Sequence, residues 1–328
     1  MRRSSTARFA AVVLAAALGL GTLAACSGGS AGDGTTPSPE ASAGPSSEAT
    51  PGVDAAADEA ALAGVTVTGD AGAKPTITLP SAPFTVTSQV ARLVDQGDGD
   101  ALAAGYVAQL HILEVSGADG TERGNTWDAA QAQPTVVDPT ALFPQLYELL
   151  AAAKVGSRIL LAAPTTDGTG SVVDLLEVQG VIPVDATRAE GSTVAPAANL
   201  PAVTLDDTGK PTLATPTGDA PTSLVVQELI HGAGPAVAAG QTVVVKYTGW
   251  LWDGTQFDSS WDSGRVFPVA NVGQAQVIAG WNQGLVGLTV GSQAMLVIPP
   301  DLGYGASASG PIPADSTLVF VVDVLAAG

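Results

Sequence analysis

The sequence predicts an α+β protein of two tandem domains, each a curved antiparallel sheet wrapped around one short helix. The first observation behind this prediction is an internal repeat. The stretch "VTGDAGAKPT" at 67–76 is answered by "VTLDDTGKPT" at 203–212, and "AAAKVGSRILLAAP" at 151–164 parallels "VGLTVGSQAMLVIP" at 286–299. Such spacing indicates two copies of one folding unit.

The second observation is the hydropathy pattern inside the later copy. Val243, Val245 and Tyr247 alternate with their neighbours, and residues 318–324 alternate in the same way, which is typical of half-buried antiparallel strands. The Asp253-Gly254 pair predicts a hairpin turn. Residues 277–288 place apolar side chains at helical spacing instead, which predicts the short helix.

The repeat sets the domain boundaries. We expect one domain over residues 65–182 and a second over 203–328, each of a size that can bury its own core. The intervening residues 183–202 have the Pro, Ala and Thr content of a linker. Near the end of each copy, "VVDLLEV" at 172–178 aligns with "VVDVLAA" at 321–327.

The N-terminus predicts export. Residues 1–25 combine three arginines with a short apolar run, which is the pattern of a secretory signal peptide. The quartet Leu23 to Cys26 resembles a bacterial lipobox, so we expect a lipid on Cys26, the single cysteine of the chain. Residues 26–64 are rich in Gly, Ser, Pro and Ala and predict a disordered, lipid-anchored tether. The expected location is the outer face of the bacterial cytoplasmic membrane.

The charge balance narrows the classes of partner. The chain has 31 acidic and 12 basic residues and a formal net charge of −19, so nucleic acid is not expected as a partner. His111 and His231 lie 120 residues apart, and no Cys, Asp or Glu cluster near either has metal-ligand spacing. We therefore expect no metal and no cofactor.

The later copy resembles a known enzyme family over its whole length. Residues 224–327, read as "LVVQELIHGAG…VKYTGWLWDGTQFDSS…VIAGWNQGLVGLTVGS…IPPDLGYG…TLVFVVDVL", are similar to the FKBP family of peptidyl-prolyl cis-trans isomerases. The resemblance implies FKBP-like domains, in which a sheet wraps around one helix, and isomerisation of X-Pro bonds in exported polypeptides. It also implies a macrolide ligand.

Carried over by position, the resemblance assigns a proline pocket. It implies these catalytic residues: Tyr247, Phe257, Asp258, Trp281, Tyr304 and Phe320. It implies these substrate-binding residues: Phe267, Val277, Ile278 and Ile312. In this assignment Trp281 is the floor, Asp258 lies beside the substrate carbonyl, and Ile312 lies on a flap of residues 301–313. The backbone N–H of Ile278 and the Tyr304 hydroxyl are the implied hydrogen-bond donors.

Amide rotation explains why such a site needs aromatic walls. The planar form is held by resonance behind a barrier of about 18–20 kcal/mol, and the twisted form has lost the charge separation of the planar one. An apolar, dry pocket therefore favours the transition state over the ground state. To shorten X-Pro isomerisation from tens of seconds to milliseconds, the pocket must lower the activation free energy by about 5–6 kcal/mol. This reaction needs neither a nucleophile nor a metal.

The earlier copy lacks this set of residues. Ile112 stands where Tyr247 is, Arg123-Gly124 replaces Phe257-Asp258, and Leu146 replaces Trp281. The earlier copy also has a much shorter segment where the later copy has its flap, so we expect residues 65–182 to be a degenerate, silent FKBP-like domain.

The later copy departs from the FKBP pattern at two places, and two alternative functions stay open. The later copy lacks the usual arginine partner of the Asp, for which Arg265 is the nearest substitute, and its flap is short, which bears on macrolide affinity. A non-catalytic lipoprotein that binds proline peptides, or acts as a chaperone, would use the same pocket without turnover. A solute-capture lipoprotein fits the tether but not the predicted fold.

Overall fold

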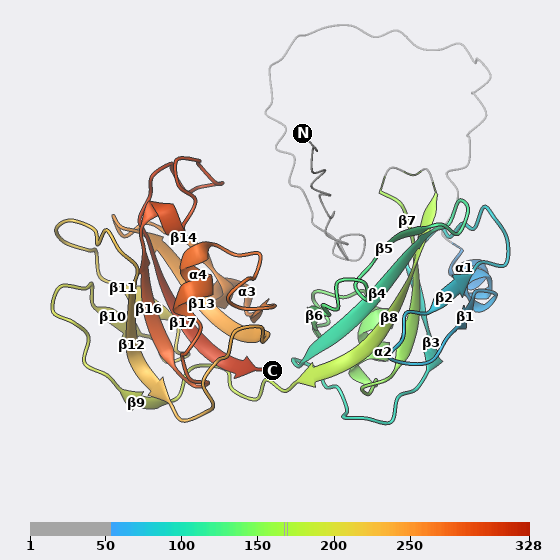
Figure 1. Ribbon diagram of the computed structural model, residues 1–328, viewed down its shortest axis with the longest axis horizontal. Coiled ribbons are helices and arrows are strands. Elements are labelled where there is room, and N and C mark those ends of the chain that lie inside the picture. The colour runs from blue at the N-terminus through green and yellow to red at the C-terminus, as the bar shows by residue number, and fades with distance from the viewer. Residues whose placement is uncertain (1–53, 167, 169) are drawn as a thin grey trace, which may run out of the picture.

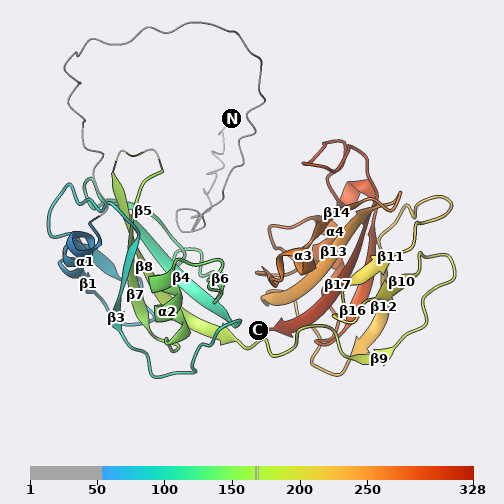
Figure 2. The same cartoon turned by 180° about the vertical axis from the view of Figure 1, so that it is seen from behind.

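The computed structural model describes residues 54–166, 168 and 170–328 and contains two large sheets, one in each of two lobes (Figure 1, Figure 2). The C-terminus lies between the lobes in both views. The predicted signal peptide, the predicted lipidation site Cys26 and the predicted tether up to residue 53 lie outside the described residues. Within the described residues, no helix is both long enough and apolar enough to cross a bilayer.

The first sheet is antiparallel throughout, in the order β3-β7-β8-β4-β5, and β6 also pairs with β4. The strands are β3 (Val90–Asp95), β4 (Val107–Ser116), β5 (Glu122–Asn125), β6 (Gln133–Val136), β7 (Arg158–Pro164) and β8 (Ser171–Ile182). Helix α2 (Pro144–Ala151) packs on one face through Leu146 and Leu150, both fully buried.

The second sheet has the order β14-β13-β17-β16-β12-β9, and β15 pairs with β13. Its strands are β9 (Gly191–Thr193), β12 (Val225–Gly232), β13 (Val243–Leu251), β14 (Gln256–Ser259), β15 (Phe267–Val269), β16 (Gln293–Ile298) and β17 (Leu318–Ala327). Helix α4 (Ala279–Gly284) packs on one face, and two single turns, α3 (Ser260–Ser263) and η2 (Pro300–Leu302), complete the unit.

The predicted fold class is confirmed, because the two sheets match strand for strand. Strands β3, β7, β8, β4, β5 and β6 correspond in order to β12, β16, β17, β13, β14 and β15, and α2 corresponds to α4. One side-chain-to-backbone hydrogen bond is also repeated in the two sheets. The Thr126 hydroxyl accepts the N–H of Ile112, and the Ser260 hydroxyl accepts the N–H of Tyr247, both within 2.9 Å.

The alignment of the two "VVD" stretches is wrong by three residues. In the first sheet Arg158 of β7 lies opposite Glu177, whereas in the second its counterpart Gln293 lies opposite Asp323. Glu177 therefore corresponds to Asp323, and Asp174 corresponds to Phe320. The two "VVD" stretches look alike although they occupy different positions of the sheet, because valine recurs along both strands. The identical residues therefore suggested the wrong register.

Each sheet is covered on its other face by a small hairpin that the prediction did not include. Strands β1 (Thr66–Thr68) and β2 (Thr76–Thr78) form the first hairpin, and β10 (Val203–Leu205) and β11 (Pro211–Leu213) form the second. Ile77 and Leu213 from these hairpins are buried in the cores behind the sheets. A sheet apolar on both faces needs such a cover on the side away from its helix.

The predicted tether is wrong in its last ten residues. Residues 55–63 form α1 (Ala55–Ala63), whose Asp54 side chain accepts the N–H of Ala57 as an N-cap. Leu62 is buried, and the carboxylate of Asp58 accepts four hydrogen bonds from Thr87 and Ser88. These hydrogen bonds hold the pKa of Asp58 below its ordinary value despite burial, which acts in the opposite direction.

The predicted linker is wrong in its middle. Strand β9 lies inside residues 183–202 and pairs with β12, so the edge of the second sheet begins there. The N–H of Ala189 donates to Asp323 Oδ2 at 2.7 Å, and the N–H of Glu190 donates to the carbonyl of Gly291 at 3.0 Å. Composition alone could not reveal these hydrogen bonds, because the backbone makes them.

The two domains contact each other through one apolar cluster and one arginine. Val107 and Ile182 of the first domain share a buried cluster with Val244 and Ala326 of the second. Arg265 donates through Nη2 to the carbonyl of Thr140 at 2.7 Å, and its Nε lies 3.4 Å from Asp138 Oδ2. Strand β15 runs beside β6 near this contact.

Candidate active site

Five aromatic rings meet on the helix side of the second sheet, and we call them the aromatic cluster. The cluster consists of Tyr247 (β13), Phe257 (β14), Phe267 (β15), Trp281 (α4) and Phe320 (β17). Tyr247 and Phe320 each have their ring centroid 5.2 Å from that of Trp281, both edge-on. The family resemblance implied that these residues line one pocket, and the structure brings them together from five separate elements.

The remaining ring contacts close the cluster. Phe267 lies 6.0 Å from Trp281 and 5.7 Å from Tyr247, and Phe257 lies 5.5 Å from Phe320, again edge-on. Edge-to-face pairs are the favoured arrangement of aromatic rings. Trp281 and Phe320 are buried, whereas Phe267 is 38% exposed, so the cluster opens to solvent on the β15 side.

A glycine in β13 makes room for two of the rings. Gly249 lies opposite Phe320 on β17 and Asp258 on β14. A Cβ at this position would lie 2.7 Å from Phe257 Cζ and 2.8 Å from Phe320 Cε1, closer than carbon atoms approach. The two phenylalanines therefore lie directly over bare backbone.

Trp281 is held by a short helix that a single asparagine anchors. Asn282 Oδ1 accepts the N–H groups of Gly273 and Ala275, and its Nδ2 donates to the carbonyl of Ala275. The indole N–H of Trp281 is buried and has no partner among the described residues. An unpaired buried donor destabilises a fold by about 1–3 kcal/mol. Leu146, its counterpart in the first sheet, is fully buried without that penalty.

Tyr247 and Asp258 are the polar pair of the site. The Tyr247 hydroxyl donates to Asp258 Oδ2. Burial first, then this hydrogen bond and the charge of Asp258, raise the pKa of Tyr247 above its ordinary value, so the phenol stays protonated at neutral pH. The carboxylate of Asp258 is thus already engaged by the cluster itself.

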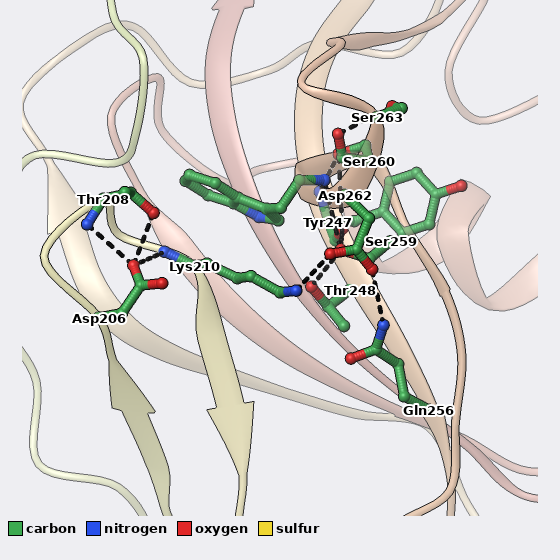
Figure 3. Close-up of polar contacts among 11 residues, drawn as sticks. Asp206, Thr208, Lys210, Tyr247, Thr248, Gln256, Ser259, Ser260, Asp262 and Ser263 are labelled. Atoms are coloured by element: carbon green, nitrogen blue, oxygen red, sulfur yellow. Dashed lines mark hydrogen bonds and ion pairs between the residues drawn. The ribbon is translucent and has the colours of Figure 1, made fainter.

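A polar framework lies behind Tyr247 on the other side of its strand (Figure 3). The Ser260 hydroxyl fixes the Tyr247 backbone, and the buried Ser259 and Thr248 hydroxyls lie 2.9 Å apart. Asp262 of α3 binds Gln256 and forms an ion pair with Lys210 of the β10–β11 turn. The hairpin behind the sheet is therefore tied to the element that positions Tyr247.

The other predicted residues surround the cluster. Ile312 is buried in the same core, and Val277 and Ile278, which lead into α4, pack against it half-buried. Tyr304 lies on the flap, 41% exposed, and its proximity contributes to the raised pKa of Tyr247. The roles of the Ile278 N–H and the Tyr304 hydroxyl towards a substrate stay predictions.

Arg265 does not replace the missing arginine partner of Asp258. Its guanidinium instead binds Asp138 and Thr140 of the first domain. Sequence spacing placed Arg265 only two residues from the expected position, but the left-handed Gly264 cap of α3 lies directly before it, and the chain then enters β15.

One pair of contacts on the outer side of the sheets was missed. Lys246 Nζ lies 4.3 Å from the ring centroid of Trp261, and His111 stacks on Trp127 with centroids 4.8 Å apart. His111 corresponds to Lys246 by strand pairing, and Trp127 and Trp261 each follow the end of a corresponding strand, Asn125 and Ser259, by two residues. Lys246 follows His111 by 135 residues and Trp261 follows Trp127 by 134, close to the offset of the repeat, which was the available signal. Both are framework contacts, since they lie away from the aromatic cluster.

The first sheet is built differently where the second has its cluster. Ile112 and Leu146 are fully buried in place of Tyr247 and Trp281. Asp174 stands at the position of Phe320, and Glu114 stands at that of Gly249, because these residues are paired in each sheet. Arg123, at the position of Phe257, lies 3.2 Å from Glu114 Oε1.

Asp174 is an unusual group for a core. It is 6% exposed, and its Oδ1 has no hydrogen-bond partner among the described residues. Burial and the nearby charge of Glu114 raise its pKa to about 8, against the opposing effect of Arg123. No group of three or more metal-ligating side chains occurs in the described part of the chain.

Comparisons with known proteins identify the family of the second domain. The family model "FKBP-type peptidyl-prolyl cis-trans isomerase" matches residues 234–325. FK506-binding protein 1 of Aspergillus oryzae is 44% identical over 106 residues, which are 30% of this chain and 91% of that protein. An FK506-binding protein of Streptomyces anulatus is 40% identical over 120 residues, covering 36% and 96% respectively.

Among solved structures, AtFKBP13 is 31% identical, covers 32% of this chain and 94% of its own, and gives a TM-score of 0.30. The matched region contains all five rings of the aromatic cluster, as well as Asp258 and Tyr304. The chain therefore belongs to the FKBP family and is an FKBP-type peptidyl-prolyl cis-trans isomerase.

Proposed function

We propose that the second domain accelerates rotation of X-Pro bonds in exported polypeptides through a dry pocket bounded by the aromatic cluster. The observation that carries the proposal is the meeting of five rings from five elements on one face of the sheet, at the positions that the family resemblance assigns to the proline site. The matching face of the first sheet has none of these rings.

The chemistry of the cluster suits a reaction that breaks no bond. Its walls are apolar, and its one titratable wall residue, Tyr247, stays neutral because its pKa is raised. A neutral, water-poor surface destabilises the charge-separated planar amide relative to the twisted one. A prolyl ring against Trp281 would leave the preceding carbonyl on the side of Tyr247 and Asp258.

The unsatisfied indole of Trp281 supports a functional reason for this residue. Packing alone does not require it, since Leu146 fills the corresponding position in the first domain without an unpaired donor. A residue that weakens the fold and persists only in the copy with the aromatic cluster is expected to serve that site.

The partners and location follow from the N-terminal residues. We propose that the chain works at the outer face of the bacterial cytoplasmic membrane, anchored by lipid on Cys26, and that its substrates are exported proline-containing polypeptides. The excess of acidic residues disfavours nucleic acid. A macrolide is a second ligand for the same cluster, as the names of the relatives suggest.

A proline tetrapeptide assay on the full chain tests the assignment. Wild type is expected to isomerise the peptide, and Trp281→Leu, which installs the residue of the first domain, should lower kcat/KM about tenfold or more. Leu146→Met in the first domain is the matched control and should leave the rate unchanged. Full activity in a folded Trp281→Leu variant would remove the cluster as the site. Absence of turnover in wild type would overturn the proposed function.

A further inference from the structure

The strongest unexplained feature is a cavity of about 380 Å³ between the two domains. Its walls are residues 131–134 of the first domain and residues 267–270 and 274–277 of the second. Phe267 and Val277 belong to both the cavity and the site described above. The cavity is thus continuous with the aromatic cluster.

The cavity wall from the first domain has an amide side chain where the second domain has an aromatic one. By strand pairing, Gln133 of β6 stands where Phe267 of β15 does, and Pro134 stands where Pro268 does. The two edge strands therefore present corresponding residues to one shared space. One side of that space is aromatic, and the other is uncharged and polar.

The four glutamine side chains of this cavity are exposed and have no partners among the described residues. None of the side-chain amides of Gln131, Gln133, Gln274 and Gln276 makes a hydrogen bond to any described residue. A primary amide both donates and accepts, so it pairs with the N–H or the C=O of a peptide equally well. No charged side chain lines the cavity, although the chain as a whole is strongly acidic.

Contacts between the two domains hold the first domain beside the aromatic cluster. The contacts of Arg265 with Asp138 and Thr140 lie close to β15 along the chain, and the cluster of Val107, Ile182, Val244 and Ala326 lies along the same interface. A cavity of 300–1,000 Å³ is the usual size of a binding site. A second polar cavity of about 390 Å³ shares Gln131, Ala132 and Ala270, and continues the path towards His111.

We propose that this cavity binds the uncharged polypeptide flanking the prolyl residue, so that the first domain selects long substrates although it carries no aromatic cluster. The inference rests on the proposed function, because the flanking chain must enter from the aromatic cluster. Amide side chains fit an extended backbone, and β6 and β15 are edge strands beside which such a chain can lie.

The test uses the full chain and two uncharged substrates, a proline tetrapeptide and a peptide of roughly 16 residues with a central proline. The longer peptide spans some 50 Å when extended and reaches through the cavity. Ala132→Trp should raise KM for the long peptide about fivefold and leave the tetrapeptide within about twofold, because only the long peptide needs the filled space.

Two variants control this measurement. Ala118→Trp adds the same ring to an exposed turn of the first domain and should change neither rate. Gln133→Ala adds no bulk and should raise KM for the long peptide about threefold, through the loss of one hydrogen bond. If Ala132→Trp and Gln133→Ala affect both substrates equally, or neither, the inference is wrong.

A binding readout separates this inference from the proposed function. Long peptides with a photoreactive phenylalanine three residues before or after the proline should cross-link wild type at residues 131–134 from one of the two positions. Absence of these cross-links, with normal turnover of the tetrapeptide, overturns the cavity as a subsite and leaves the proposed function intact. Absence of all turnover overturns the proposed function instead.

Discussion

The two domains share a strand order, a helix position and even single hydrogen bonds, yet their helix-side faces differ. In the second domain Gly249, Phe257 and Phe320 meet over the sheet. In the first, the corresponding residues are Glu114, Arg123 and Asp174. The difference shows that the framework specifies the sheet, while a few positions on one face decide whether an aromatic cluster forms.

The two domains also differ in which buried polar groups lack a hydrogen-bond partner. The first domain fills its core with aliphatic residues around Leu146 and leaves one buried carboxyl, Asp174, without a partner for Oδ1. The second keeps an unpaired indole on Trp281. Asp174 and Trp281 each hold a buried polar atom without a partner among the described residues, at neighbouring positions of the same face.

The largest effect is expected from placing the carboxyl of the first domain into the second. Phe320→Asp removes one ring and adds a charge beside Tyr247 and Trp281, so kcat/KM for a proline tetrapeptide should fall at least about 100-fold. Burying an unpaired carboxylate should also destabilise the domain by several kcal/mol, which thermal unfolding measures. Phe320→Leu is the control and should lose much less of both. A folded Phe320→Asp variant with normal turnover would contradict the comparison.

The second prediction concerns Asp174 and pH. Its pKa in the folded chain is raised to about 8 from an ordinary 3.8, so the folded state holds a proton that the unfolded state has lost. Stability is therefore fully present below the unfolded pKa and falls as pH rises towards 8.

Asp174→Asn should remove this loss. The free energy of unfolding at about pH 8.5 should rise by about 2 kcal/mol relative to wild type, with little change near pH 4. The exposed Asp98→Asn substitution is the control and should shift neither value. Denaturant unfolding at the two pH values measures the effect, and a pH-independent difference would show that Asp174 is not held protonated.

Gly249 offers the third way to sharpen the comparison. Gly249→Ala places a Cβ against Phe257 and Phe320, which must then move by several tenths of an ångström. We expect about a tenfold loss of kcat/KM with little change in overall fold. Gly264→Ala, where a Cβ would meet open space, is not a matched control because its φ of 69° is itself strained. Gly170→Ala in the first domain, where a Cβ would also meet open space and φ is outside the left-handed region, is the control and should leave kcat/KM unchanged.

The smallest effect should follow Tyr247→Phe. It removes the hydrogen bond to Asp258 but keeps the ring, so we expect about a threefold loss of kcat/KM. Because the pKa of Tyr247 is raised above its ordinary value, wild-type activity should not fall through phenol ionisation up to about pH 9.5. A wild-type decline near pH 8 that Tyr247→Phe abolishes would contradict this assignment.

Much of the second domain could be predicted because its signals are local. The strands predicted along 243–247 and 318–324 are confirmed as β13 and β17, but the predicted half-burial is wrong, because both strands are buried on both faces. Asp253-Gly254 forms the turn, with Gly254 at a φ of 89°. The helical spacing over 277–288 is confirmed only for Ala279–Gly284, since the following glycines allow the chain to turn into β16. Five of the predicted site residues meet as rings.

The parts that were missed depend on tertiary pairing. The register of β8 could not be read from "VVD", so the buried Asp174 was not recognised as the counterpart of Phe320. Strand β9 and helix α1 were hidden in stretches of linker composition, because their order comes from hydrogen bonds to distant residues such as Asp323 and Thr87. No local pattern encodes such contacts.

The pairing of β9 with β12 also has a consequence for dissecting the molecule. A fragment that starts at residue 203 would leave the outer edge of β12 bare, with backbone donors and acceptors ready to recruit a strand from another molecule. Self-association of such a piece would then be an artefact of where the chain was cut. In the full chain, strand β9 covers this edge of β12 and so prevents another molecule from pairing with it.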